Sequence, residues 1–485
     1  MGSIPLSKKM DDFMNNACSD ETESLCPVCL KRIKATRLPQ GDEVFMVKEC
    51  EDHGSFKTLI WRGEPSMDQW RRPKDPVHPY LCYGTVEKGC PFDCGLCEDH
   101  AQLPCSVLLE VTDRCNLHCA FCFADSGRGE AKEPSLDRIA WLLERAMAAV
   151  GPSNLQLSGG EPTLRDDLPE IVQVARRIGY SFIQVNTNGL RLASDRAYVK
   201  QLLTAGLSSV FLQFDGVNDE IYRSLRGRAL LDQKLGAIKN CGVAGLGVVL
   251  VPTLVRGINT DSIGDIVRQA LQLAPTVRGI HFQPVSYFGR FPGQAGDKGH
   301  LTLPELMRCL EEQTGSIVKV PDFSPPGCEH AHCSFHATYM RLAKGGLRLL
   351  GAGKEDNCCS ANFGGGGVRK TVETVSRRWT LPSPAPFSSH FPLLEETPCC
   401  VGSNLDTPGA ENPLDLDIFL KEIATQSFTI SAMAFQDAEN LDLERLRGCC
   451  ISVLSHDGKL IPFCAYNLTS RERRSLYRQR RVLRS

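Results

Sequence analysis

Three cysteines in the first third of the chain have the spacing of ligands for an iron–sulfur cluster. The segment reads Cys115-Asn-Leu-His-Cys119-Ala-Phe-Cys122, with three residues and then two residues between the thiols. A short loop of this kind can wrap three corners of a cubane cluster and leave the fourth iron open, as in a catalytic metal site. A chelating amino acid can then bind that iron through its amine and carboxylate. The alternatives are a closed cluster and a zinc knuckle, because short motifs also arise by chance.

An earlier group of metal-ligand residues resembles a rubredoxin-like or zinc-ribbon module. Cys26 and Cys29 form one knuckle, and Cys50 with His53 forms the second. Four N/S ligands at this separation suit one tetrahedral iron or zinc ion. Cys18 is the rival of His53 for the fourth position.

A third group repeats the three-then-two spacing. Cys90, Cys94 and Cys97 lie shortly before the first group described, and Cys105 follows them closely. We expect a closed auxiliary cluster here, with Cys105 as its fourth ligand.

The total of 23 cysteines supports metal binding over disulfide formation. A secreted disulfide scaffold is short, whereas this chain has 485 residues and its first twenty residues lack the continuous apolar run of a secretory signal. Clustered thiols in a reducing compartment are more often metal ligands. We therefore expect a cytoplasmic protein with several metal sites.

Alternating strands and helices must position these cysteines. Helices are expected between the strands, for example over 136–150, 168–178 and 262–273, and such crossovers indicate parallel βαβ units in a sheet that curls into a full or partial barrel. Cys115 follows the first strand directly, at the strand end where barrel enzymes carry their chemistry. The expected strands are Ser106–Thr112, Asn154–Ser158, Phe182–Thr187, Ser209–Asp215, Leu246–Thr253 and Gly279–Pro284.

Polar or glycine-rich segments end the successive strands. The second strand ends in Ser158-Gly159-Gly160-Glu161-Pro162, where glycines let the backbone approach a ligand and the carboxylate can meet an ammonium group. The third ends in Asn186-Thr187-Asn188-Gly189, which suits ribose hydroxyls, and the fourth in Gln213-Phe214-Asp215-Gly216. Each could be an ordinary turn. Their recurrence at strand ends favours a shared pocket.

The triad, the aromatic residue before its last cysteine and the Gly-Gly-Glu-Pro segment resemble the radical S-adenosylmethionine (SAM) superfamily over about Ser106 to Arg290. The resemblance implies an α/β fold with a partial (β/α)6 TIM-like barrel and a one-electron donor such as ferredoxin or flavodoxin. It implies a [4Fe–4S] cluster that cleaves SAM to a 5′-deoxyadenosyl radical, which removes hydrogen from an unactivated carbon. The implied SAM pocket consists of Phe121, Gly159, Gly160, Glu161, Asn186, Asn188, Gln213 and Asp215.

Segments outside the barrel are similar to one subfamily, the tetraether lipid synthase-like radical enzymes, which is also associated with methylation of a pterin precursor. They are the metal ribbon, Gly89–Cys97, Ser431–Ala438 and Leu460–Asn467. The resemblance implies one catalytic and one or two auxiliary [4Fe–4S] clusters beside the single iron or zinc ion of the ribbon. The candidate ligands of a further cluster are Cys328, Cys333, Cys449 or Cys450, and Cys464.

The domain organisation follows from these groups. We expect a poorly ordered insertion at 351–404, because this segment is rich in Gly, Pro and Ser and shows no helical or strand period. The arginine-rich tail, 471–485, is interpreted as solvated or as a patch for lipid head groups. The other parts are the metal module (18–72), an auxiliary-cluster segment (80–105), the barrel (106–295) and a C-terminal auxiliary or substrate region (296–350 and 405–470).

Composition limits the classes of molecule that the protein is expected to bind. The net charge of −2 argues against a broad nucleic-acid surface. The longest apolar stretch, Val243–Val255, is shorter than the ~20 residues of a membrane span, which leaves peripheral membrane contact as the expected limit.

Three functions fit these observations. The first is radical carbon–carbon bond formation on a lipid-like alkyl chain, and the second is radical methylation of a small pterin-type heterocycle. The third is iron–sulfur electron transfer without catalysis. The polar strand ends argue against the third, because electron transfer needs no nucleoside pocket.

Overall fold

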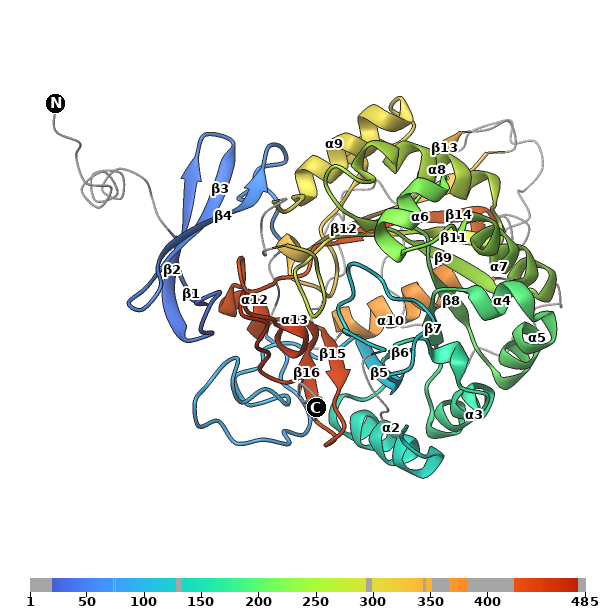
Figure 1. Cartoon of the computed structure of the whole chain (residues 1–485), viewed down its shortest axis with the longest axis horizontal. Helices are drawn as coiled ribbons and strands as arrows, with labels where there is room; N and C mark the ends of the chain where they lie inside the picture. The colour runs from blue at the N-terminus through green and yellow to red at the C-terminus, as the bar shows by residue number, and fades with distance from the viewer. Residues whose placement is uncertain are drawn as a thin grey trace, which may run out of the picture.

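A twelve-stranded sheet curves around the centre of the molecule, with helices on its outer side (Figure 1). The computed structural model describes residues 20–72, 74, 76–127, 133–293, 299–342, 346–350, 366–381 and 423–478. Eight strands are parallel neighbours in the order β15-β5-β6-β7-β8-β9-β11-β14. Antiparallel strands flank them, β16 beside β15 and β12–β13 beside β14. The two edges are not paired within the described residues, so the barrel is partial.

The elements of the barrel have the following bounds. The strands are β5 (Ser106–Thr112), β6 (Asn154–Gly159), β7 (Ile183–Thr187), β8 (Ser209–Gln213), β9 (Gly247–Val251), β10 (Thr253–Leu254), β11 (Val277–Pro284), β12 (Ser334–Arg341), β13 (Leu347–Leu349), β14 (Ser427–Met433), β15 (Ile451–Leu454) and β16 (Leu460–Pro462). The helices are α2 (Leu136–Val150), α3 (Leu168–Ile178), α4 (Leu190–Ser194), α5 (Arg196–Ala205), α6 (Asp219–Arg226), α7 (Leu231–Ala244), α8 (Ile263–Gln272), α9 (Leu303–Thr314), α10 (Gly366–Trp379), α12 (Leu443–Arg447) and α13 (Phe463–Asn467).

Local sequence explains the outer helices, as α2 illustrates. The backbone N–H of Arg138 donates to the Ser135 side chain, which caps the first turn, and Gly151 ends the helix with a positive φ of 71°. The apolar residues recur at three- and four-residue spacing and are buried on the sheet side. The structure confirms the predicted partial α/β barrel. All six predicted strands and the three predicted helices are present, and their ends agree within one or two residues.

Two parallel strands were not predicted. β14 pairs with β11 and β15 pairs with β5, so residues from the C-terminal part of the chain extend the barrel at both edges. β15 has only four residues, which is too short to show a clear alternation of polar and apolar side chains.

The N-terminal module is an antiparallel sheet of β1 (Asp20–Leu25), β2 (Arg32–Gln40), β3 (Glu43–Cys50) and β4 (Gly54–Arg62). It is the blue sheet at the left of Figure 1 and lies beside α12. Arg37 of β2 pairs with the buried carboxylate of Asp442 at 2.8 Å, and the Lys48 Nζ donates to the Ala438 carbonyl at 2.7 Å. The module is therefore fixed to the segment that leads into the C-terminal cysteines.

Part of the predicted disordered insertion is a helix. α10 contacts β9, β11 and β14, and its Val372, Val375 and Trp379 repeat at the i, i+3, i+7 spacing of a helix face. The expectation of a poorly ordered insertion is therefore wrong for 366–379. The helical period of apolar residues is present there, but it extends over too few residues to stand out. The rest of the 351–404 segment lies outside the described residues, apart from Thr380 and Leu381.

The described part of the arginine-rich tail, 471–478, packs against the barrel. Arg478 is bound to Glu110 and to the Asn467 side chain, and its Nη1 donates to the Ala124 carbonyl at 3.3 Å. Arg471 pairs with the buried Glu439 at 2.8 Å. Arg478 is engaged within the protein, which corrects the interpretation for this residue, whereas Arg471 and Arg474 are exposed and fit a solvated tail. Residues 479–485 lie outside the described part.

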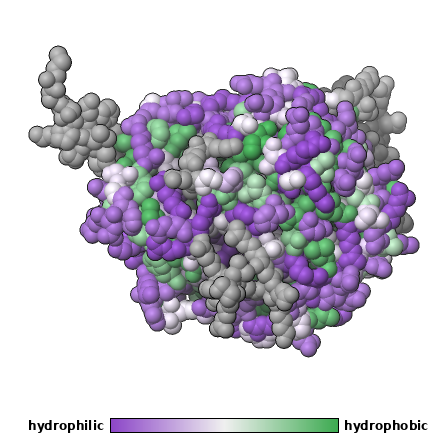
Figure 2. Space-filling view, in the orientation of Figure 1, coloured by the Kyte–Doolittle hydropathy of each residue, from purple (hydrophilic) through white to green (hydrophobic). Residues whose placement is uncertain are grey.

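Among the described residues, none of the helices is both long enough and apolar enough to cross a membrane. On the face shown in Figure 2, hydrophobic residues are interspersed with hydrophilic ones.

Candidate active site and metal centres

A cavity of about 280 Å³ occupies the interior of the barrel. At one end it is lined by Cys115, Cys119 and Cys122, which follow the carboxyl end of β5. At the other end it reaches Asn154, the first residue of β6, and Trp379 of α10. The candidate cluster site and the barrel interior therefore form one continuous space.

The loop of Cys115, Cys119 and Cys122 is held by Arg290. The backbone N–H of Cys122 donates to the Arg290 carbonyl at 2.8 Å, and the Arg290 Nε donates to the Cys119 carbonyl at the same distance. Burial raises the pKa of the Cys115 thiol to about 11, so this thiol needs the positive charge of a metal to bind as a thiolate. Three soft donors facing one cavity fit a cluster with one open corner. The sequence carried no motif that marks Arg290.

Gly159 and Gly160 bring the loop after β6 against the end of β5. The Gly160 N–H donates to the Thr112 carbonyl at 2.8 Å, and an added Cβ would lie 2.1 Å from Thr112 O at Gly159 and 2.2 Å from Arg114 O at Gly160. Within the protein, these glycines permit a close approach to backbone carbonyls, and their approach to a ligand stays a prediction. Both still line the cavity.

Glu161 is buried and accepts four hydrogen bonds from the protein. They come from the Thr163 N–H and hydroxyl, the Thr187 hydroxyl at 2.6 Å and the Asn188 N–H at 2.7 Å. The carboxylate thus fixes the loop after β7 as well as lining the cavity. Its contact with the methionine amine of SAM stays a prediction.

Asp215 does not face the cavity. Its carboxylate is fully buried and receives hydrogen bonds from Arg226 Nε at 2.7 Å, Arg226 Nη2 at 2.6 Å and the Thr253 N–H at 3.1 Å. Arg226 lines the cavity and donates to the Phe121 carbonyl at 3.3 Å. This corrects the assignment of Asp215 to the SAM pocket: it positions Arg226, which the sequence did not identify.

The remaining predicted pocket residues, Phe121, Asn186, Asn188 and Gln213, all line the cavity. A buried lysine supports two of them, because the Lys234 Nζ donates to the Asn188 carbonyl at 2.6 Å and to Gln213 Oε1 at 3.3 Å. Burial lowers the pKa of Lys234 to about 8. The contacts of Phe121, Asn186, Asn188 and Gln213 with SAM stay predictions.

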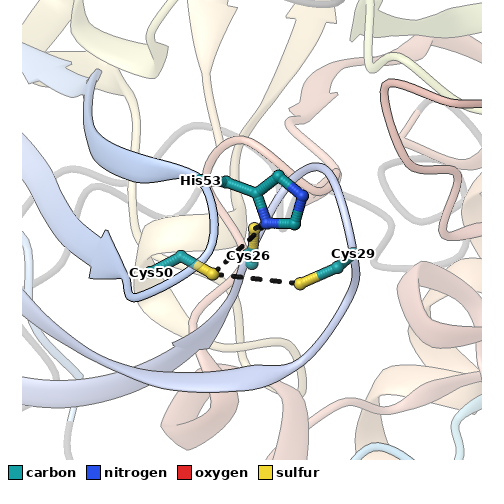
Figure 3. Close-up of side chains that lie close together, drawn as sticks. All are labelled: Cys26, Cys29, Cys50 and His53. Atoms are coloured by element: carbon teal, nitrogen blue, oxygen red, sulfur yellow. Dashed lines mark hydrogen bonds between the residues drawn. The ribbon is translucent and has the colours of Figure 1, made fainter.

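The ribbon ligands converge as the sequence indicated (Figure 3). The ligand atoms of Cys26, Cys29, Cys50 and His53 lie within 4.8 Å of one another. His53 Nδ1 is 3.7 Å from the Cys26 Sγ and 3.5 Å from the Cys50 Sγ. Two ligands of a tetrahedral zinc ion with bonds of about 2.0–2.3 Å are separated by about 3.5–3.8 Å. The geometry fits a Cys3His site with His53 as the fourth ligand; Cys18 lies outside the described residues.

Replacing His53 by Ala is expected to reduce the ribbon metal content and lower the thermal stability of the module, because metal affinity is coupled to folding at such sites. Elemental analysis and calorimetry of the full chain would measure both effects. The exposed His456→Ala is the matched control and should change neither. Full metal occupancy in the His53 variant would assign the fourth position to another residue.

Cys105 lies in a different group from the one predicted. Its Sγ is 3.5 Å from the Cys450 Sγ, and the thiols of Cys105, Cys328 and Cys450 lie within 4.8 Å of one another. Cys105 and Cys450 directly precede β5 and β15, two neighbouring parallel strands, which brings residues far apart in sequence together. This corrects the assignment of Cys105 to the cluster of Cys90, Cys94 and Cys97.

The other C-terminal candidates lie outside this group. Cys464 is buried, Cys333 and Cys449 are partly exposed, and the Cys333 Sγ is 3.1 Å from Arg445 Nη2. Of the alternatives Cys449 and Cys450, it is Cys450 that lies with Cys105 and Cys328. A metal site at Cys333, Cys449 and Cys464 stays a prediction.

The Cys90–Cys97 segment wraps a small space of its own. All three of its cysteines line this space together with Arg447 and Pro462. Asp93 accepts from the Glu87 N–H at 2.9 Å and from the Gly89 N–H at 2.8 Å, and thereby fixes the turn before Cys90. The segment therefore remains a candidate auxiliary site, without Cys105.

Comparisons with known proteins agree with the barrel and the ribbon. Residues 109–270 match the family model of the radical SAM superfamily, and residues 18–62 match that of the HMPTM N-terminal zinc ribbon domain. Among solved structures, Streptococcus suis SuiB bound to S-adenosylmethionine is similar with a TM-score of 0.38 and 17% identity over 45% of this chain and 49% of that one.

Curated relatives extend the likeness over the whole chain. A protein of Methanocaldococcus jannaschii, named 7,8-dihydro-6-hydroxymethylpterin dimethyltransferase, is 33% identical over 93% of this chain and 94% of its own length. A probable GTP 3′,8-cyclase of Methanothermobacter thermautotrophicus is 33% identical over 34% of this chain, and the match covers 54% of that relative's own length. The chain therefore belongs to the radical SAM superfamily, in the same family as the methyltransferase that it matches over nearly its full length, and it is a radical SAM enzyme.

Proposed function

We propose that this enzyme methylates a dihydropterin, replacing a carbon-bound hydrogen of the heterocycle by a methyl group. The observation that carries the proposal is the near full-length relative named for 7,8-dihydro-6-hydroxymethylpterin. Pterin methylation was the second of the functions that the sequence allowed, and the relative favours it over the first.

The cavity is consistent with a small heterocycle. A [4Fe–4S] cluster held by Cys115, Cys119 and Cys122 would supply one-electron cleavage of SAM to methionine and a 5′-deoxyadenosyl radical. The cysteine loop and the barrel interior share one continuous space, so a small substrate bound in the barrel would lie close to the three cysteines. Arg290 donates to the Cys119 carbonyl and Arg226 donates to the Phe121 carbonyl, so two arginines hold the loop of the three cysteines.

The lipid interpretation lacks this support. The cavity wall carries amide side chains from several strands, among them Gln156, Gln184 and Asn186. Arg478 of the tail, which the lipid interpretation invoked, is engaged within the protein.

The remaining cysteine groups extend the proposal to further cofactors. We infer a metal site at Cys105, Cys328 and Cys450 and a zinc ion at the ribbon. We infer an auxiliary iron–sulfur site at the buried thiols of Cys90, Cys94 and Cys97. Their sulfur-rich donor sets and burial support this assignment.

Addition of 7,8-dihydro-6-hydroxymethylpterin is expected to stimulate the formation of 5′-deoxyadenosine by the anaerobically purified, reduced enzyme. Substrate binding usually commits the reducing electron to productive cleavage by excluding water from the site. Chromatographic quantification of 5′-deoxyadenosine with and without the pterin would measure the effect. Equal amounts in both reactions would argue against the pterin as substrate.

A further inference from the structure

A set of neutral amide side chains lines the barrel between the cysteine loop and α10. Alternate residues of a strand face the same side, so β6 directs Asn154 and Gln156 into the cavity and β7 directs Gln184 and Asn186. Gln156 and Gln184 are direct neighbours in the register of these two strands. The amides therefore form a connected wall.

Three of these side chains, Gln156, Gln184 and Asn186, form a directed chain of hydrogen bonds that we call the amide row. Asn186 Nδ2 donates to Gln156 Oε1 at 3.3 Å, and Gln156 Nε2 donates to Gln184 Oε1 at 3.4 Å. Gln184 Nε2 donates to the Ser209 hydroxyl, which donates to the Gly247 carbonyl. Because a backbone carbonyl can only accept, it fixes the direction of the whole chain.

The direction of the amide row leaves an acceptor at its open end. Asn186 Oδ1 is buried and has no hydrogen-bond partner among the described atoms. A buried carbonyl without a donor is unfavourable, so a rotation of the Asn186 amide that brings this oxygen to the cavity would be stabilised by an N–H group of a ligand. Each amide of the row also keeps a second N–H. Gln184 is fully buried and holds Gln156, so the row presents the partly exposed amides of Gln156 and Asn186 to the cavity. Their neutral N–H and carbonyl groups complement the adjoining N–H, amino and carbonyl groups of a pyrimidinone ring.

The described side chains of the cavity wall do not favour a phosphate. Arg226 is the one Arg or Lys among the described residues that line the cavity. Two of its nitrogens donate to Asp215 at 2.6–2.7 Å. Burial lowers the pKa of His281 to about 4, so its imidazole is neutral near pH 7. Glu329 and Glu161 add carboxylates to the same wall. A phosphorylated ligand would therefore meet anions without a free cation.

Two aromatic side chains flank the far side of the cavity. The rings of Phe211 and Trp379 have centroids 5.6 Å apart, and His281 lies 5.4 Å from Phe211. All three line the cavity. Flat aromatic surfaces beside a row of neutral amides suit a planar heterocycle.

We propose that the amide row is the specificity-determining element for the substrate and binds the N–H and carbonyl edge of an uncharged, unphosphorylated pterin. This inference assigns Asn186 to the pterin in place of the SAM contact predicted from the sequence. Gln156 and Gln184 are positioning residues in this inference, which rests on the proposed function. A nucleotide or a pterin diphosphate, although it carries the same ring edge, is rejected for want of a cation.

Equilibrium dialysis of the anaerobic holoenzyme against three probes tests this inference. The probes are 7,8-dihydro-6-hydroxymethylpterin, its diphosphate ester and SAM. Gln156→Met and Gln184→Met should weaken binding of the unphosphorylated pterin by about tenfold to a hundredfold, the range for losing hydrogen bonds in a buried site, and leave SAM binding unchanged. Gln156→Glu keeps the side-chain shape if Met disturbs folding. Gln272→Met on the exposed side of α8 is the control.

The outcomes separate the inference from the function on which it rests. If the wild-type enzyme binds the pterin and the Met variants bind it with the same affinity, the amide row does not determine substrate specificity. Pterin methylation would then still stand. Equal loss of SAM binding would assign the row to the SAM pocket and also overturn it. Tight binding of the diphosphate would overturn the selection for an unphosphorylated ligand. A wild-type enzyme that binds SAM but neither pterin would contradict the proposed function and the inference together.

Discussion

Replacing Cys115, Cys119 and Cys122 together by Ala is expected to abolish 5′-deoxyadenosine formation and to remove the iron of one [4Fe–4S] cluster. The three thiols are the cavity-lining cysteines of one loop, and they provide the sulfur donors beside the carboxyl end of β5. The ribbon ligands and the thiols of Cys105, Cys328 and Cys450 belong to other elements. Their metals should therefore be retained.

Iron quantification after anaerobic purification and chromatographic detection of 5′-deoxyadenosine would measure these losses. Cys241→Ala is a suitable control, because Cys241 is a buried cysteine of α7 within the hydrophobic core. The control should keep its iron and its activity while losing some stability through the smaller side chain. Undiminished SAM cleavage by the triple variant would place the catalytic cluster elsewhere.

The second large effect is expected at the buried ion pair of Asp215 and Arg226. Both side chains are almost completely buried, and Asp215 raises the pKa of Arg226 further above its usual value against the opposing effect of burial. Asp215→Asn leaves the guanidinium buried without its counter-charge, which typically costs about 3–5 kcal/mol. Because whole proteins are stable by only about 5–15 kcal/mol, the variant should unfold at markedly lower denaturant concentration.

The matched control is Asp265→Asn on α8. Asp265 pairs with Arg268 at 2.7 Å, but both side chains are about half exposed, 49% each. Exposed pairs of this kind contribute less than about 1 kcal/mol. Denaturant unfolding of both variants would compare the two sites. Equal stability of the Asp215 and Asp265 variants would show that Arg226 finds another partner.

The barrel was predictable because its helices and parallel strands carry strong local patterns. The period of α2 and the apolar run of β9 are visible within ten to fifteen residues, and Cys115 follows β5 in both sequence and space. The catalytic loop and the ribbon ligands are also local motifs. Their spacing encodes the geometry directly.

The features that the sequence did not reveal depend on contacts between distant segments. Cys105 and Cys450 become neighbours only because β5 pairs with β15, across 345 residues of chain. Arg226 reaches the cavity only because Asp215 orients it from the preceding strand end. α10 was missed because a single apolar face in a Gly- and Pro-rich region gives a weak signal. Pairing of strands, unlike periodicity, cannot be read along one segment.

The most direct test of the central claim is the mass of the pterin after turnover. The reduced wild-type enzyme and the triple cysteine variant would each be incubated anaerobically with SAM and 7,8-dihydro-6-hydroxymethylpterin. We expect the pterin to gain the mass of one or two methyl groups while 5′-deoxyadenosine accumulates, and we expect neither change in the triple cysteine variant. A pterin recovered unchanged from both reactions, while the wild-type enzyme cleaves SAM and couples alkyl chains of an added lipid, would contradict the account.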